Sequence, residues 1–239
     1  MIKKILAYLI HLFTASGAVL GVFSIWAINN QRWSLYFIFI MATIIVDAVD
    51  GTFARMIDIK KVLPNFDGAM LDNIIDYFNY GLIPSYFILV SRLLDHPYNI
   101  IACILIIVAC SYQFTQKDAK TADHFFKRFP SYWNILVFYL YYWQTHFTFN
   151  FSVIVICFIL SFVPIKFIYP SRVDYLSKNP LLRKLMVLAT IGWGILTCAL
   201  IATYPERYIW LDALSVGYIL AYFLISLYRT FVPLELSKS

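Results

Sequence analysis

Residues 33–57, WSLYFIFIMATIIVDAVDGTFARMI, decide the fold of this 239-residue chain. The stretch stays apolar for long enough to form a helix that crosses about 30 Å of hydrocarbon. It lacks the strict alternation of apolar and polar residues that marks a strand of a membrane barrel. Because a backbone in lipid must satisfy its own hydrogen bonds, we predict a transmembrane helix here.

The rest of the chain repeats this pattern. Hydrophobic residues make up 62% of it and charged residues only 13%, against about 25% charged in a soluble domain, so it lacks the polar surface of a water-soluble globule. We therefore predict an all-α, polytopic transmembrane bundle of about eight spans (six to eight), which forms a single integral membrane domain over residues 1–239. The predicted spans are 8–29, 33–57, 69–93, 97–116, 132–148, 149–169, 184–204 and 208–230.

Basic residues predict how these spans are oriented, because cytoplasmic loops collect lysine and arginine. With eight spans, 16 of the 19 lysines and arginines fall on the side of the N-terminus, and the other side holds Arg32, Arg92 and Arg207. Both termini and the loops 55–70, 117–131 and 166–184 should therefore be cytoplasmic. This topology accounts for the net charge of +6 without a nucleic-acid partner. The first apolar run is longer than the core of a signal peptide, so we expect it to be retained.

Four aspartates interrupt the apolar pattern. Asp47 and Asp50 share one face of a helix, and Asp72 and Asp76 share a face of the next, because residues three or four apart are neighbours on a helix. Each ionised aspartate near a helix centre costs about 2.5–3.5 kcal/mol to insert. Arg55, the nearest basic residue, is one charge against four, and Lys60 and Lys61 lie where they can reach water. We therefore expect divalent cations to neutralise the aspartates.

Carboxylates without histidine or cysteine favour hard ions such as Mg²⁺ or Mn²⁺ over zinc, and ligand type alone leaves Ca²⁺ open. Four acids from two helices suffice for a pair of metal ions that binds a phosphoryl or pyrophosphate group. The small residues Gly51 and Ala54 lie one turn apart beside these acids and permit a flat ligand or another helix to approach closely. The pattern therefore indicates phosphoryl chemistry at one face of the membrane.

The pattern Asp47-x-x-Asp50-Gly51-x-x-Ala54-Arg55, then Gly68-x-x-x-Asp72-x-x-x-Asp76, resembles the signature of the CDP-alcohol phosphotransferases. The interval from Arg55 to Gly68 is longer than in most members, as surface loops tolerate. The extra segment 60–67 and the stretch 112–134 resemble the bacterial phosphatidylcholine synthases within that family. The resemblance to these synthases extends from about residue 10 to residue 135.

This resemblance implies that CDP-diacylglycerol and choline react to give phosphatidylcholine and CMP. It implies two divalent ions, Mn²⁺ or Mg²⁺, on Asp47, Asp50, Asp72 and Asp76, with Asp76 also acting as the general base for direct attack by choline. The resemblance further implies a homodimer in the bacterial inner membrane, with the active site facing the cytoplasm. The residues expected to contact the nucleotide are Gly51, Ala54, Arg55 and Gly68.

Choline carries a quaternary ammonium group, which donates no hydrogen bond and is recognised by aromatic faces. Candidates for such a cage flank the acids or the stretch 112–134, and they are Tyr77, Tyr80, Tyr112, Tyr132 and Trp133. Lys120, Lys127 and Arg128 are candidates for binding a lipid phosphate, although a basic cytoplasmic loop is equally well explained by membrane orientation.

Two alternatives remain open on the sequence alone. The acceptor alcohol could be serine, inositol or glycerol phosphate in place of choline. The acids could instead line the ion pathway of a cation-coupled transporter, but such acids should be spread through the membrane, whereas these gather near one face. The enzyme is therefore favoured over the transporter.

Overall fold

The chain folds into helices, as predicted. This computed structural model describes residues 2–169, 177 and 179–232. Two two-residue strands, β1 (Phe126–Lys127) and β2 (Lys166–Phe167), pair antiparallel in the loops. The helices in order are α1 (Ile2–Asn29), α2 (Trp33–Met56), α3 (Ile59–Val62), α4 (Gly68–Asp76), η1 (Tyr77–Leu82), α5 (Ile83–Val90), α6 (Tyr98–Thr115), α7 (Trp133–Tyr142), α8 (Phe147–Leu160), α9 (Pro180–Thr203) and α10 (Ile209–Phe231).

Five helices are long and apolar enough to cross a membrane, namely α1, α2, α6, α9 and α10. The predicted span 69–93 is a continuous helical segment made of α4, the π-helical turn η1 and α5. α7 and α8 are shorter than predicted: their 10 and 14 residues correspond to about 15 and 21 Å at 1.5 Å per residue. The total number of crossings stays a prediction.

Side-chain caps set where two of these helices begin. The Asp67 carboxylate accepts a hydrogen bond from the Met70 backbone N–H, at 3.0 Å, at the start of α4. The Asn179 side chain accepts one from the Leu181 backbone N–H, at 2.9 Å, and Pro180 occupies the first turn of α9. Both caps satisfy backbone donors that a helix leaves free at its N-terminus.

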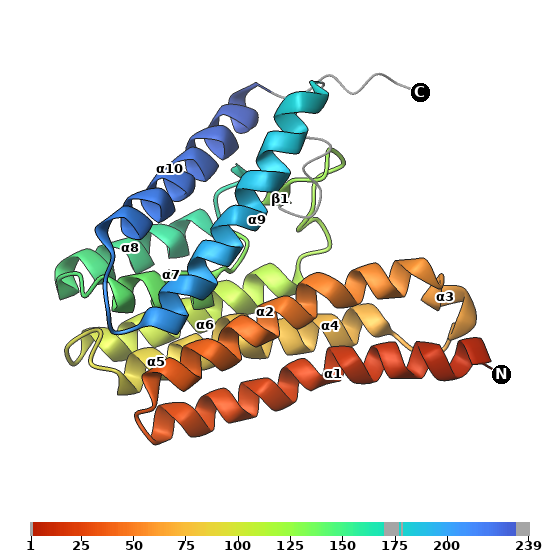
Figure 1. Cartoon of the computed structure of the whole chain (residues 1–239), viewed down its shortest axis with the longest axis horizontal. Helices are drawn as coiled ribbons and strands as arrows, with labels where there is room; N and C mark the ends of the chain where they lie inside the picture. Colours follow the sequence, from red (N-terminus) through yellow and green to blue (C-terminus); the bar gives the residue numbers. More distant parts are fainter. Residues whose placement is uncertain (1, 170–176, 178, 233–239) are drawn as a thin grey trace.

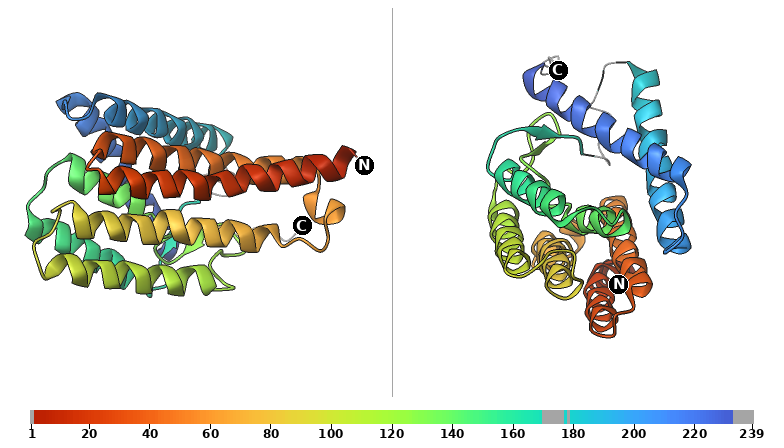
Figure 2. Two further views of the ribbon diagram at one scale, coloured as in Figure 1. Left: turned by 90° about the horizontal axis from the view of Figure 1, so that it is seen from below. Right: turned by 90° about the vertical axis from the view of Figure 1, so that its left-hand side faces the viewer.

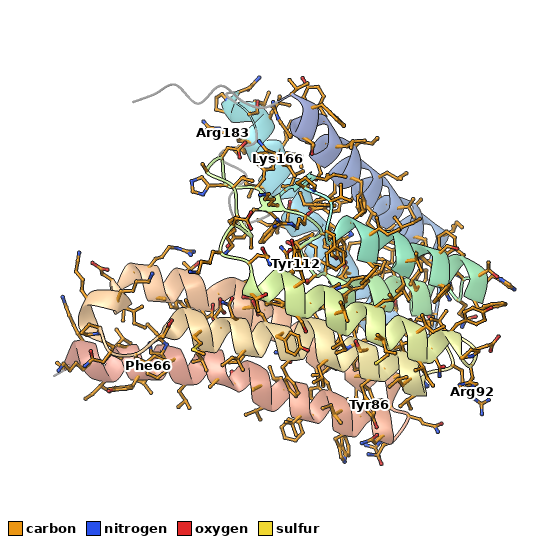
Figure 3. The ribbon with its side chains drawn as sticks, turned by 180° about the vertical axis from the view of Figure 1, so that it is seen from behind. Phe66, Tyr86, Arg92, Tyr112, Lys166 and Arg183 are labelled. Carbon is orange, nitrogen blue, oxygen red and sulfur yellow. The ribbon has the colours of Figure 1, made fainter. Side chains whose placement is uncertain are left out.

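The helices form a bundle in which α1 and α2 lie side by side and α4 packs against α1 (Figures 1 and 2). α9 packs against α2, and α10 packs against α9 (Figure 2). The turn between α1 and α2 and the turn between α9 and α10 lie at the end of the bundle opposite the N-terminus and α3 (Figure 1). Figure 3 labels Phe66 at one end and Arg92 at the other. Arg32, Arg92 and Arg207 are thus separated from the basic loops, as the predicted topology requires; which end faces the cytoplasm stays a prediction, and Arg172, Lys178 and Lys238 lie outside the described residues.

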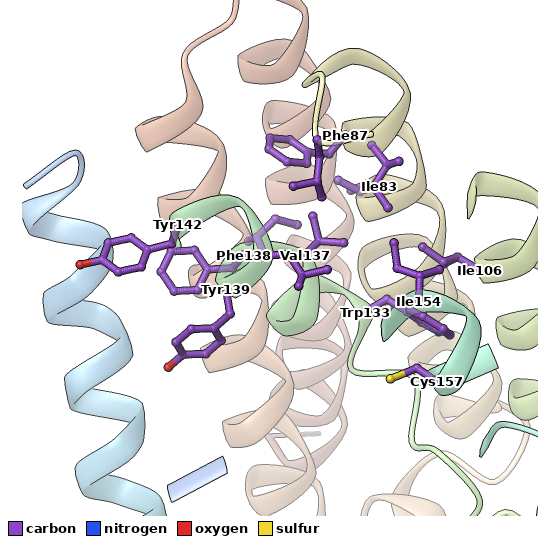
Figure 4. Packing of buried hydrophobic residues seen from close by; sticks show 14 of the residues in the cluster. Ile83, Phe87, Ile106, Trp133, Val137, Phe138, Tyr139, Tyr142, Ile154 and Cys157 are labelled. Atoms are coloured by element: carbon purple, nitrogen blue, oxygen red, sulfur yellow. The ribbon is translucent and has the colours of Figure 1, made fainter. Parts of the chain in front are cut away.

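The interior is built around α7 (Figure 4). Trp133 and Val137 on this helix are fully buried, and Phe138 packs edge-on against Phe37 of α2, with ring centroids 5.0 Å apart. Because α7 is surrounded by other helices, its apolar side chains face protein instead of lipid. By contrast, α1, α6, α9 and α10 leave large apolar side chains exposed, such as Leu12, Ile104, Ile195 and Leu224. These outer faces fit a lipid environment.

Candidate active site

All four aspartates line one small cavity between α1, α2, α4 and η1. We call it the acid cavity. Its lining consists of Thr14 and Gly17 from α1, Thr43, Val46, Asp47 and Asp50 from α2, Asp72, Ile75 and Asp76 from α4, and Asn79 from η1. The two pairs of acids, predicted separately from helical spacing, therefore face each other across the packed helices.

Three of the acids come within ligand distance of a shared ion. Oxygen atoms of Asp47, Asp50 and Asp72 all lie within 4.8 Å of one another. This purely carboxylate donor set suits a hard divalent cation, so the residues present fit the predicted metal. Asp76 lines the same cavity but does not belong to this group of three. The geometry therefore distinguishes Asp76 from the other three acids.

Tyr80 holds one of these acids in place. Its hydroxyl donates a hydrogen bond to Oδ2 of Asp47 at 2.6 Å, and its ring is buried. The residue comes four positions after Asp76, so the π-helical turn η1 presents it on the same side as the acids. The structure thus places this candidate for the choline cage beneath the acids, with its polar tip already bound to one of them.

Asn79 is a buried polar side chain of the acid cavity. Its Nδ2 donates a hydrogen bond to the Gly17 carbonyl oxygen at 3.2 Å. Its Oδ1 has no hydrogen-bond partner among the described residues. A Cβ atom at Gly21 would lie 2.5 Å from this Oδ1, so the glycine lets α1 approach Asn79 closely. Small residues on α1 therefore give Asn79 its position at the wall of the acid cavity.

The residues expected to contact the nucleotide lie at the ends of α2 and α4. Arg55 is exposed and donates a hydrogen bond to the Thr52 hydroxyl at 3.0 Å, and its guanidinium covers Gly51. Gly68 begins α4, where a Cβ atom would lie 2.5 Å from the His11 ring. Gly51 and Ala54 are half-buried on the turns that follow Asp47 and Asp50. Nucleotide contact by these residues stays a prediction.

The other aromatic candidates for a choline cage lie at different depths. Trp133 is fully buried against Phe129 in the core. The Tyr77 hydroxyl lies 3.4 Å from the Ser111 hydroxyl, and the Tyr112 ring lies under the Arg128 guanidinium, 5.4 Å from it. Tyr132 is half-buried, and its ring meets that of Phe126 edge-on. Trp133 therefore lies in the core, and choline binding by the other candidates stays a prediction.

The three basic candidates for binding a lipid phosphate have different partners. Lys127 and Arg128 both pair with Asp118, at 2.5 and 3.1 Å. Hydrogen bonds from these two residues lower the pKa of the Asp118 carboxyl to about 2. The ion pairs of the described residues do not include Lys120, whose Nζ lies 3.5 Å from the Tyr169 hydroxyl oxygen, to which it donates a hydrogen bond. Lipid-phosphate binding by these three residues stays a prediction.

Two polar residues of the acid cavity were missed by the sequence analysis. Thr43 lies four positions before Asp47, and Asn79 lies three positions after Asp76. Both are buried and face the cavity. The signal was present, because both continue the polar face of an apolar helix at helical spacing.

Known proteins resemble the chain over the whole range that lines the acid cavity. Residues 7–163 match the profile of a family described as CDP-alcohol phosphatidyltransferase. A phosphatidylcholine synthase from Legionella pneumophila is 43% identical over 235 residues, which cover 97% of this chain and 91% of that protein. One from Legionella bozemanae is 42% identical, covering 90% of this chain and all of that protein. One from Borreliella burgdorferi is 42% identical, covering 74% and 76%. The range that matches the family contains every residue that lines the acid cavity.

Proposed function

Because the chain belongs to the CDP-alcohol phosphatidyltransferase family, we propose that it transfers the phosphatidyl group of CDP-diacylglycerol to choline, giving phosphatidylcholine and CMP. Family membership makes the chain an enzyme, and its long apolar helices make it a membrane protein. The observation that carries the proposal is the convergence of Asp47, Asp50, Asp72 and Asp76 on one cavity. The similarity to phosphatidylcholine synthases supports choline as the acceptor.

In the proposed reaction, the choline hydroxyl oxygen forms a bond to the phosphorus that carries diacylglycerol. The bond from this phosphorus to the bridging oxygen breaks, and CMP leaves with the electron pair. Asp47, Asp50 and Asp72, together with Asp76, would hold two divalent ions, either Mg²⁺ or Mn²⁺. When bound, these ions would offset the charge of the pyrophosphate and of the leaving CMP.

Asp76 is the proposed acceptor of the hydroxyl proton. A carboxylate is far less basic than an alkoxide, so Asp76 can take the proton only as the new oxygen–phosphorus bond forms. Asp76 lines the acid cavity but lies outside the group of three acids. This supports both of its proposed roles, because one of its two carboxylate oxygens can accept the proton while the other helps to hold a metal ion. Gly51, Ala54, Arg55 and Gly68 would contact the cytidine nucleotide, and positioning of both substrates would supply much of the rate.

The proposal also places the enzyme in the bacterial inner membrane as a homodimer, with the acid cavity open to the cytoplasm. The uneven distribution of lysine and arginine supports this orientation, because the loop 117–131 lies on the basic side. Choline and CMP would then enter and leave on the same side as the metal ions.

An acceptor panel tests the proposed function. Purified protein receives CDP-diacylglycerol, Mn²⁺ and, separately, choline, serine, inositol or glycerol phosphate, and CMP release is measured. We expect release with choline, and release slower by about 100-fold or more in Asp76→Asn. Release only with another alcohol would overturn choline as the acceptor, and an absence of metal-dependent release with all four would overturn the reaction.

A further inference from the structure

Asn79 lies where the helical segment that carries Asp72 and Asp76 meets α1. It follows Asp76 by three positions, on the π-helical turn η1, and it lines the acid cavity. Its side chain is only 2% exposed. A buried amide costs free energy unless its donor and its acceptor are both bonded. An apolar side chain would fill this space at lower cost, so the amide serves a purpose other than packing.

The amide links η1 to α1. Its Nδ2 donates a hydrogen bond to the Gly17 carbonyl oxygen at 3.2 Å. A helix carbonyl oxygen can accept this second bond because it has two lone pairs. Glycine at positions 17 and 21 leaves that carbonyl uncovered by side chains, so another helix can approach it. The Asn79 side chain thus occupies a groove on α1, where a Cβ atom at Gly21 would lie 2.5 Å from its Oδ1.

Only half of this amide is bonded. Oδ1 has no hydrogen-bond partner among the described residues, and an unpaired buried acceptor offsets what the Nδ2 bond contributes to stability. The net contribution of Asn79 to the stability of the fold is therefore small. Residues that break the rules of core packing in this way are expected at functional sites. The bond to Gly17 is thus better explained by the placement of η1 than by overall stability.

The turn η1 interrupts the regular α-helical ladder directly after α4. The Ile83 N–H bonds the Phe78 carbonyl oxygen, five residues back, as in a π-helix. Such turns are rare, occur singly within α-helices and frequently lie at functional sites. Two consecutive residues link this turn to different helices, since Asn79 bonds the α1 backbone and Tyr80 bonds Asp47 of α2. η1 is thereby held by both α1 and α2.

Asp76 is the acid whose position depends most on η1. Asp47, Asp50 and Asp72 come together as a group, and Asp76 lies outside that group. Its carboxylate must nevertheless come within hydrogen-bond distance of the attacking hydroxyl, and a misplacement of about 1 Å can cost about 100-fold in rate. Asp76 is the last residue of α4, and η1 begins at the next residue. Movement of η1 away from α1 would therefore move Asp76 as well.

We infer that Asn79 is a positioning residue for Asp76: its hydrogen bond to the Gly17 carbonyl oxygen holds η1 against α1 and keeps Asp76 in place in the acid cavity. The inference rests on the proposed function, because it takes Asp76 as the proton acceptor. It holds for whichever alcohol is the acceptor. The bond ends on the α1 backbone and not on an acid, so it does not depend on the metal ions.

Asn79→Leu tests this role, because leucine has a similar size and lacks both polar groups. No buried group of residue 79 is left unpaired in this variant, so its thermal midpoint in detergent should stay close to that of the wild type. We expect kcat for CMP release at saturating Mn²⁺, with the alcohol that the wild type uses, to fall about 10-fold. Ser85→Ala is the matched control. Its buried hydroxyl bonds the Gly81 carbonyl oxygen at 2.7 Å within the same helical segment, so kcat should be nearly unchanged.

Combination with Asp76→Asn separates positioning from a merely structural role. A residue that acts through Asp76 loses its effect once the carboxylate is gone, so Asn79→Leu should lower kcat less than about 2-fold in the Asp76→Asn background. A residue that only stabilises the fold would lower kcat by the same factor in both backgrounds. Asn79→Ala, which removes the amide without added bulk, should show the same dependence on Asp76. Equal factors in both backgrounds, or an unchanged kcat in Asn79→Leu, would overturn the inference.

A measurement without substrate distinguishes this inference from the proposed function. Hydrogen–deuterium exchange of the segment 72–82 is followed in the full-length protein. Loss of the hydrogen bond to α1 should speed exchange there about 5-fold in Asn79→Leu and not in Ser85→Ala. If the wild type releases no CMP with any alcohol, the proposed function is wrong, and faster exchange still supports the link to α1. Equal exchange in the wild type and Asn79→Leu would overturn the link whatever the activity.

Discussion

The Tyr80 hydroxyl donates a hydrogen bond to Oδ2 of Asp47 from within the helix that carries Asp72 and Asp76. One bond thereby links the two halves of the acid quartet. A carboxylate that is held by a buried donor has one preferred orientation, and such outer partners tune how well a ligand binds its metal. Tyr80 is therefore a positioning residue for Asp47.

Replacement of Tyr80 by phenylalanine tests this relationship. Tyr80→Phe removes only the hydroxyl, so we expect the Mn²⁺ concentration for half-maximal activity to rise about 10-fold, while the rate at saturating Mn²⁺ changes less. Tyr77→Phe is the matched control, because its hydroxyl meets Ser111 and not an acid. Equal metal dependence in both variants would show that the Tyr80 hydroxyl does not position a metal ligand.

Replacement of Asp76 should mainly lower kcat, whereas replacement of Asp72 should mainly weaken Mn²⁺ binding. Asp76→Asn removes the proposed proton acceptor, and we expect kcat at saturating Mn²⁺ to fall by about 100-fold or more, with a smaller loss of Mn²⁺ binding. Asp72→Asn removes a member of the group of three acids and should weaken Mn²⁺ binding itself. Activity and Mn²⁺ binding are measured on the same preparations. If Asp76→Asn retained full kcat, Asp76 would not be the base.

Asp118 should stabilise the loop 116–131 at neutral pH. Its pKa in the folded protein is lowered from 3.8 to about 2 by Lys127 and Arg128. A carboxyl whose pKa is lower in the folded protein than in the unfolded chain stabilises the fold at every pH above its pKa in the unfolded chain. This stabilisation is lost as the pH falls through its pKa in the folded protein. We therefore expect protection from hydrogen–deuterium exchange, taken relative to the intrinsic rate at each pH, to be constant in this loop around neutral pH and to be lower in Asp118→Asn at every such pH. Exchange that is unchanged by the substitution would show that the ion pairs do not order the loop.

Gly81 permits η1 to touch α6. A Cβ atom at this position would lie 2.7 Å from Cys110 Sγ and 3.0 Å from Cys110 Cβ. We expect Gly81→Ala to destabilise the protein by about 1–3 kcal/mol through overpacking. Gly217→Ala is the control, because nothing lies within 4 Å of a Cβ atom there, and alanine favours a helix by about 1 kcal/mol. Thermal unfolding in detergent should give a lower midpoint for the first variant only, and equal midpoints would contradict the close packing.

The fold and the acid quartet could be predicted because both depend on local periodicity. Long apolar runs predict helices, and acids spaced by three or four share a helix face. The lengths of α7 and α8 could not be predicted, because an apolar run faces either lipid or protein and composition does not distinguish the two. α7 faces protein, as the full burial of Trp133 and Val137 shows.

The pairing of the loop 117–131 with the segment 166–169 lay beyond such prediction for a different reason. Lys120 and Phe126 are separated from Tyr169 in the sequence by α7 and α8, and the two segments meet through strands of two residues each. Strands this short have no alternating pattern that a sequence could reveal.

The most direct test of the account is Mn²⁺ binding to the acid cavity, followed by electron paramagnetic resonance on the purified full-length protein. We predict that the wild type binds Mn²⁺ and that Asp72→Asn binds it at least about 10-fold more weakly. Asp118→Asn, which removes an equally charged aspartate outside the cavity, should bind as the wild type does. Equal Mn²⁺ binding by all three proteins would contradict the claim that the aspartate quartet is the metal site of this enzyme.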